Sequence, residues 1–178
     1  MIARELKEKN IAEYLIYMWQ IEDLIRANGC DMDALNRHVL QHYPENQRRE
    51  AEEWFANLIE MMRAEGVMEK GHLQINRNVM QNLQELHAAL LSSTQYPFYN
   101  AAYFKALPFI VELRQKGRNV EQESELETCF EAIYGLLLLR LQKKDISAGT
   151  AKAMEVITSF LSLLANYYDK EHKGELEL

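Results

Sequence analysis

Two histidines one helical turn apart are the residues whose spacing points most directly to chemistry. His38 and His42 stand four positions apart in a segment expected to be helical, so their imidazoles can share a metal ion. Asp31 can add an oxygen ligand, but it is equally placed to cap that helix. No Glu-x-x-His pair of the di-iron type lies inside an expected helix. We therefore predict no metal and no cofactor, with His38 and His42 as the alternative metal pair.

A second polar group lies on the segment 10–28, which is apolar on most sides and is expected to be a buried central helix. Glu22 and Arg26 are four positions apart and can form an ion pair where this helix leaves the core. Carboxylates on a largely buried helix can do acid–base work, although structural ion pairs have the same signature. We favour the structural interpretation and keep the functional one open.

A third candidate is His87, beside the apolar stripe of the helix expected from residue 76. No Ser, Cys or Lys stands near it in a recognisable nucleophile context. A half-buried histidine that is hydrogen-bonded to a neighbouring helix is the favoured interpretation. The sequence thus predicts no catalytic residue and favours a non-enzymatic protein.

The segment 96–109 is dense in aromatic residues and contains Pro97 and Pro108. Aromatic side chains beside a break in a helix are typical of a pocket or an interface, and they also occur in plain core. As a ligand or partner surface we single out its first five aromatic residues, Tyr96, Phe98, Tyr99, Tyr103 and Phe104.

These residues must be positioned by helices. With 3 Pro and 7 Gly in 178 residues, long uninterrupted elements are expected. We predict an all-α fold, a compact bundle of six or seven helices around 10–28, with at most one tiny hairpin near 67–75. Pro108 should kink or split its helix near Leu107. The last helix carries a heptad-like stripe that should pack lengthwise against a neighbour: Met154, Ile157, Leu161, Leu164 and Tyr168.

Length and charge limit the classes of function. The length predicts one domain over 1–170, with a polar, flexible tail at 171–178. A net charge of −7 disfavours binding to nucleic acid or to anionic membranes. The chain begins without an apolar signal segment, and its two cysteines, Cys30 and Cys129, match no ligand or redox spacing. We expect a cytoplasmic protein that does not span a membrane.

Three stretches carry a resemblance to a known family: the helix 10–27, GHLQIN at 71–76 with ELHAAL at 85–90, and PFY at 97–99 through LPFIVELR at 107–114. Together they resemble an uncharacterised family of Bacteroidales proteins, the domain of unknown function numbered 4924. The resemblance implies a helical, cytoplasmic bacterial protein. It implies no catalytic residue, substrate or partner.

Two functions remain open on the sequence. The leading hypothesis is a non-enzymatic helical module that acts by protein–protein association, as a homodimer or with another protein. The alternative is a small-molecule-binding protein or enzyme with a pocket between 10–28 and 96–109. Its polar groups would be Glu22, Arg26 and His87.

Overall fold

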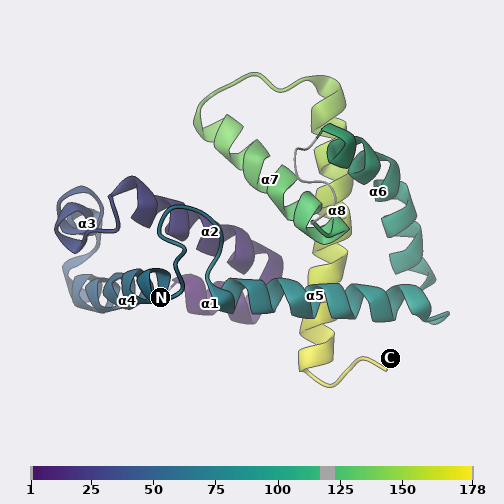
Figure 1. The fold of residues 1–178 in the computed structure, drawn as a ribbon. Coiled ribbons are helices and arrows are strands. Elements are labelled where there is room, and N and C mark those ends of the chain that lie inside the picture. The colour runs from purple at the N-terminus through teal and green to yellow at the C-terminus, as the bar shows by residue number, and fades with distance from the viewer. Residues whose placement is uncertain (1, 117–122, 178) are drawn as a thin grey trace. The chain divides into compact units, whose positions relative to one another are not determined.

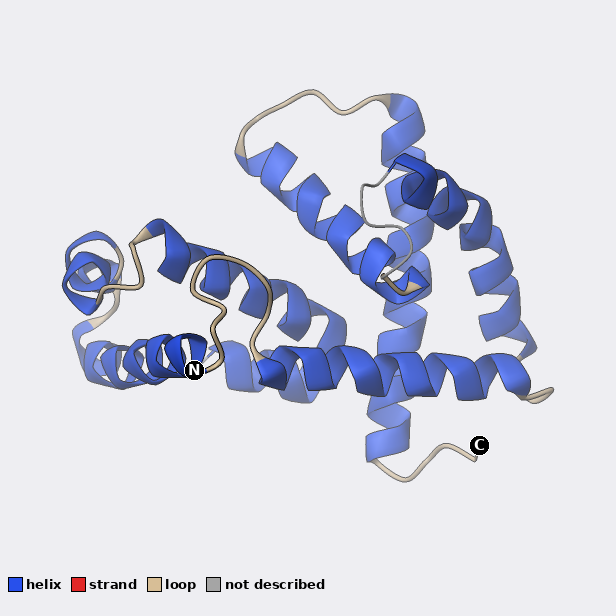
Figure 2. Cartoon of the chain, viewed as in Figure 1, coloured by secondary structure: helices blue, strands red, loops and turns tan. Residues whose placement is uncertain are grey.

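Every regular element in the described part of the chain is a helix (Figure 2). The computed structural model describes residues 2–116 and 123–177. In these residues the elements are α1 (Ile2–Lys9), α2 (Ile11–Ala27), α3 (Met32–His38), the 3-10 helix η1 (Leu40–His42), α4 (Glu45–Ala64), α5 (Gln74–Ser92), α6 (Pro97–Lys116), α7 (Glu125–Leu141) and α8 (Ala148–His172) (Figure 1). The all-α prediction is confirmed.

The predicted number of helices was too low, since the described residues hold eight α-helices. The polar lead at 2–9, which the sequence did not assign to a helix, forms α1. The segment 67–73 is a loop, with no strand in the described residues around it. None of the helices in the described ranges is long and apolar enough to cross a bilayer.

Within the described ranges, contacts divide the chain into two compact units. Residues 2–7 and 13–79 form the first unit, and residues 8–12 with the described part of 80–177 form the second. The boundary at 79/80 lies inside α5. The prediction of one domain over 1–170 stays a prediction.

Most of α2, from Glu13 onward, belongs to the first unit, and the helix is buried along most of its circumference. Leu15 and Ile25 have no exposed surface and Met18 is 2% exposed. Asn10 Oδ1 accepts a hydrogen bond from the Ala12 backbone N–H at 3.1 Å, which satisfies one of the free donors at the helix start. The chain leaves α2 through Gly29 at φ +67°, a left-handed conformation that suits glycine. The predicted buried N-terminal helix and both of its ends are confirmed.

In the second unit, α6, α7 and α8 pack against one another. The predicted stripe of α8 is buried at all five positions, Met154, Ile157, Leu161, Leu164 and Tyr168. Ser124 and Glu127 form a capping box at the start of α7. The apolar stripe of α8 is therefore covered by packing within the same chain.

Pro108 lies inside α6 without ending it, so of the predicted kink or split near Leu107 the split is wrong and the kink stays a prediction. Proline removes one N–H from the helical ladder, and Figure 1 shows α6 as one continuous ribbon that curves along its length. Ala106 and Ile110 are fully buried on either side of Pro108. Their burial holds both halves of the helix against the rest of the unit.

Candidate functional sites

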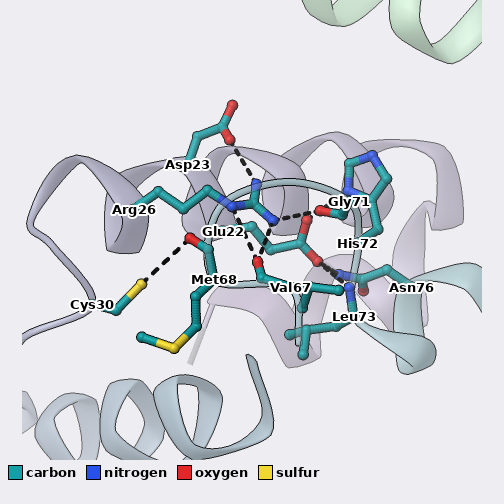
Figure 3. A network of polar contacts seen from close by, with 10 residues as sticks. All are labelled: Glu22, Asp23, Arg26, Cys30, Val67, Met68, Gly71, His72, Leu73 and Asn76. Atoms are coloured by element: carbon teal, nitrogen blue, oxygen red, sulfur yellow. Dashed lines mark hydrogen bonds and ion pairs between the residues drawn. The ribbon is translucent and has the colours of Figure 1, made fainter. Parts of the chain in front are cut away.

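The carboxylate of Glu22 is the most deeply buried charged group on α2, with no exposed surface. Its Oε1 accepts hydrogen bonds from the Leu73 backbone N–H at 2.9 Å and from Asn76 Nδ2 at 2.6 Å. Its Oε2 lies 2.6 Å from His72 Nδ1 (Figure 3). Both oxygens are thus occupied by partners from the end of the 67–73 loop and from the first turn of α5.

His72 is held on two sides. Besides its contact with Glu22, its ring stacks on Trp19, with centroids 4.3 Å apart and an interplanar angle of 14°. The His72 side chain is 35% exposed. A carboxylate–imidazole pair of this kind can orient a histidine for proton transfer, and it can equally hold a loop in place. In the described ranges no group of three or more His, Cys, Asp or Glu residues lies close enough to bind a metal ion.

Arg26 fastens the same loop from the next turn of α2. Its Nε and Nη2 donate to the Val67 carbonyl at 3.3 and 3.0 Å, and Nη2 also donates to the Gly71 carbonyl (Figure 3). Its Nη1 pairs with Asp23 at 2.9 Å. The predicted Glu22–Arg26 ion pair is therefore wrong, because Glu22 turns into the core while Arg26 reaches over the loop. We call Glu22, Arg26, His72 and Asn76 the loop anchor.

The histidine pair of the metal hypothesis does not share one helix. The α-helix ends at His38, Val39 has φ −122° and ψ −60°, and His42 lies in η1. His38 Nδ1 is 2.9 Å from Asn28 Oδ1. Asp31 caps α3 by accepting from the Ala34 N–H at 2.9 Å. The helical register that would align the two imidazoles is broken, and the oxygen proposed as a third ligand serves as a cap.

In the second unit, His87 sits among aromatic rings. Its Nδ1 is 2.7 Å from the Tyr99 hydroxyl, and its ring makes edge contacts with Tyr99, Tyr103 and Phe160. Burial lowers the pKa of His87, while the negative charge of Glu125 acts in the opposite direction. This is the half-buried histidine, bonded to a neighbouring helix, that the sequence favoured.

The aromatic segment divides into an inner and an outer set. Tyr99 is fully buried, and Tyr103 is 9% exposed and donates to Glu125 Oε2 at 2.7 Å. Burial raises the pKa of the Tyr103 hydroxyl to about 12, and the bond to Glu125 acts in the same direction. Tyr96 packs edge-on against Tyr167 and donates to the Glu177 carbonyl. Phe98 and Phe104 instead face solvent, at 83% and 62% exposed.

Exposed residues continue along one side of α6. We define the outer face of α6 as seven of its exposed residues, Phe98, Ala101, Phe104, Lys105, Pro108, Val111 and Glu112. The spacing of 101, 104, 108 and 111 alternates three and four, as in a helix that packs lengthwise on a partner. This face lies opposite the buried row of Tyr99, Tyr103, Ala106 and Ile110.

The polar groups of the predicted small-molecule pocket lie in different units. Glu22 and Arg26 belong to the first unit and His87 to the second. Each has its hydrogen-bond partners within its own unit.

A comparison with models of known protein families assigns the chain to a family. A family model described as a domain of unknown function, DUF4924, matches residues 1–175. The chain belongs to this family. No curated protein and no solved structure matches it. The resemblance to an uncharacterised family is thus confirmed, and the DUF4924 assignment adds no activity to the geometry.

Sequence reasoning on this DUF4924 chain missed His72 and Asn76 in the loop anchor, and Lys105 and Glu112 on α6. One signal was available for the first pair. A glutamate on a helix that is apolar on most sides needs donors from elsewhere in the chain. For Lys105 and Glu112, the available signal was the alternating spacing of small and apolar residues around Pro108, which is typical of a helix that packs on a partner.

Proposed function

We propose that this DUF4924 protein is a non-enzymatic module that acts by protein–protein association, and that it binds a second copy of itself through the outer face of α6. The observation that carries the proposal is the exposure of Phe98 and Phe104, at 83% and 62%, on a helix whose opposite side is buried. Aromatic residues are enriched in the cores of protein interfaces.

Burial of this face would supply the driving force. Removing apolar surface from water contributes about 25 cal/mol per Å². A contact centred on one helix per copy belongs at the small end of the size range for specific interfaces, so we expect a dissociation constant in the micromolar range, about 1–100 μM. The apolar stripe of α8 is buried inside the second unit, so the proposal does not use it as an interface between copies.

The test is sedimentation velocity across a dilution series from about 1 to 200 μM, a range that brackets the expected constant. Wild type should shift from monomer to dimer, and Phe104→Glu should stay monomeric because it places a charge in the apolar contact. Leu141→Glu is the matched control, since Leu141 is 67% exposed at the end of α7 and lies outside the outer face of α6. Wild type that stays monomeric throughout, or equal dimerisation of both variants, would overturn the proposal.

A cytoplasmic location in a bacterium of the Bacteroidales is part of the same proposal. Its support is the family resemblance together with Cys30 and Cys129, which are buried and free. Free thiols are typical of reducing compartments.

A further inference from the structure

We infer that the two copies pair α6 against α6 in antiparallel orientation, about a two-fold axis beside Pro108, and that Lys105 and Glu112 determine this orientation. The inference rests on the proposed function and adds its geometry. It follows from how the residues of the outer face are distributed around Pro108.

The first step is the spacing along the helix. Phe104 lies four positions before Pro108, and Val111 lies three positions after it. A two-fold axis at Pro108 exchanges the two directions along the helix. Phe104 of one copy then lies level with Val111 of the other, to within one residue, or about 1.5 Å of helical rise.

The charged side chains of the outer face are also placed symmetrically about Pro108. Lys105 lies three positions before Pro108, and Glu112 lies four positions after it. The same axis sets Lys105 of each copy level with Glu112 of the other, again to within one residue. Glu112 Oε1 already accepts from Lys116 at 2.5 Å, and this leaves Oε2 for Lys105 of the second copy.

The distribution around the helix separates the two orientations. At 3.6 residues per turn, Phe104 and Val111 flank Pro108 on one side, and Lys105 and Glu112 flank it on the other. An antiparallel two-fold pair brings like flanks together, so apolar side chains meet apolar side chains and opposite charges meet. A parallel two-fold pair would set the charged flank of each helix against the Phe104 flank of the other. The outer face is therefore self-complementary in the antiparallel orientation.

The residues nearest the axis allow close approach. Pro108 lies at the axis and Ala101 lies two turns before it on the midline of the outer face, and both are small and exposed. Helices with small side chains at the contact pack at the short end of the usual interaxial range of about 8–10 Å. At that separation Phe104, four positions from Pro108, covers the apolar edge of the contact.

Charge reversal tests the orientation. In a two-fold dimer, Lys105→Glu alone converts two attractive contacts into two repulsive ones, and so does Glu112→Lys alone. Each single variant should raise the dissociation constant of the dimer about three- to tenfold in low-salt buffer, as expected for two exposed ion pairs. The double variant K105E/E112K should return to within about twofold of wild type. An equimolar mixture of the two single variants should associate more tightly than either variant alone.

The matched control is the exposed pair Arg49 and Glu53 on α4, 3.2 Å apart. Arg49→Glu should leave dimerisation unchanged, and circular dichroism should show the same helix content in every variant. If both α6 single variants dimerise like wild type while Phe104→Glu does not dimerise, the antiparallel register is wrong and the proposed function stands. If wild type does not dimerise at all, the proposed function and the antiparallel register are both overturned. Singles that weaken the dimer without restoration in the double variant also overturn the Lys105–Glu112 pairing.

Discussion

The loop anchor of the first unit and the outer face of α6 in the second unit differ in the burial and bonding of their side chains. In the loop anchor, a fully buried carboxylate has both oxygens bonded, and Arg26 donates to two loop carbonyls and to Asp23. On α6, two phenylalanines remain in solvent although the helix buries a full row of residues on its other side.

The difference separates structural from binding residues. Buried polar groups that satisfy one another stabilise a fold, and removing one partner strands the others. Exposed aromatic residues contribute little to the stability of the monomer, because they contact solvent before and after folding. The loop anchor is therefore built as part of the first unit's architecture, and the outer face of α6 is the surface to which we assign the proposed association.

The largest expected effect is on the loop anchor. Glu22→Ala leaves the Leu73 N–H, the Asn76 amide and His72 without their buried acceptor, and it should lower the free energy of unfolding by about 3 kcal/mol. Urea unfolding followed by tryptophan fluorescence measures this, since Trp19 and Trp54 both lie in the first unit. Glu53→Ala, on an exposed site of α4, is the control and should cost under about 0.5 kcal/mol. Equal effects of the two changes would contradict a structural role for the loop anchor.

A smaller effect is expected at Arg26. Arg26→Lys retains the charge but cannot donate to Val67 and Gly71 in the same fork geometry, so it should cost about 1–2 kcal/mol and release the loop. Limited trypsin digestion read by mass spectrometry should show faster cleavage after Lys70 than in wild type. The control is Arg63→Lys, on the exposed side of α4, in which trypsin should cleave after Lys70 at the wild-type rate. Unchanged cleavage in Arg26→Lys would mean that the guanidinium does not hold the loop.

On α6 the expected change in stability is close to zero. Phe104→Ala should alter the free energy of unfolding by under about 0.5 kcal/mol, because the side chain is 62% exposed. The measurement is urea unfolding followed by circular dichroism, in protein dilute enough to be monomeric. A cost above about 2 kcal/mol would show that Phe104 belongs to the core of the monomer, as large-to-small changes at buried positions do.

The smallest effect concerns pH. Because burial lowers the pKa of His87 in the folded state, the unfolded chain binds a proton first as the pH falls. The contribution of His87 to stability is complete above the unfolded pKa of about 6.5 and is lost as the pH falls toward the lower folded value. His87→Gln should therefore lose less stability than wild type between pH 7.5 and 5.5, as measured by urea midpoints. His42→Gln, at an exposed site, is the control and should show the same loss of stability as wild type. If His87→Gln also loses as much stability as wild type, burial of His87 does not cause the pH dependence.

Local features of this fold were predictable from the sequence. Periodicity identified α2 and the stripe of α8, and the caps at Asn10 and Asp31 follow from short-range hydrogen bonds. Pro108 was expected to kink or split α6; the helix does not end there, because burial of Ala106 and Ile110 outweighs the lost hydrogen bond. Val39 ends the helix that was expected to reach His42.

The sites depended on contacts that the sequence does not encode locally. Glu22 meets His72 and Asn76 across about fifty residues of chain, so no spacing rule could pair them. Neighbouring aromatic residues on α6 point to opposite sides, and the sequence alone did not indicate which side the core occupies. Once Tyr99 and Tyr103 are known to be buried, the exposure of Phe98 and Phe104 follows from helical geometry.

The most direct test of the central claim is a cross-link at the proposed axis. Pro108→Cys places one thiol per copy beside the two-fold axis, while the native Cys30 and Cys129 are buried. Under mild oxidation we predict a disulfide-linked dimer on non-reducing gels, whereas Thr158→Cys, on an exposed position of α8, should remain monomeric. Equal cross-linking of both variants, or none for Pro108→Cys at concentrations where wild type dimerises, would contradict association through the outer face of α6.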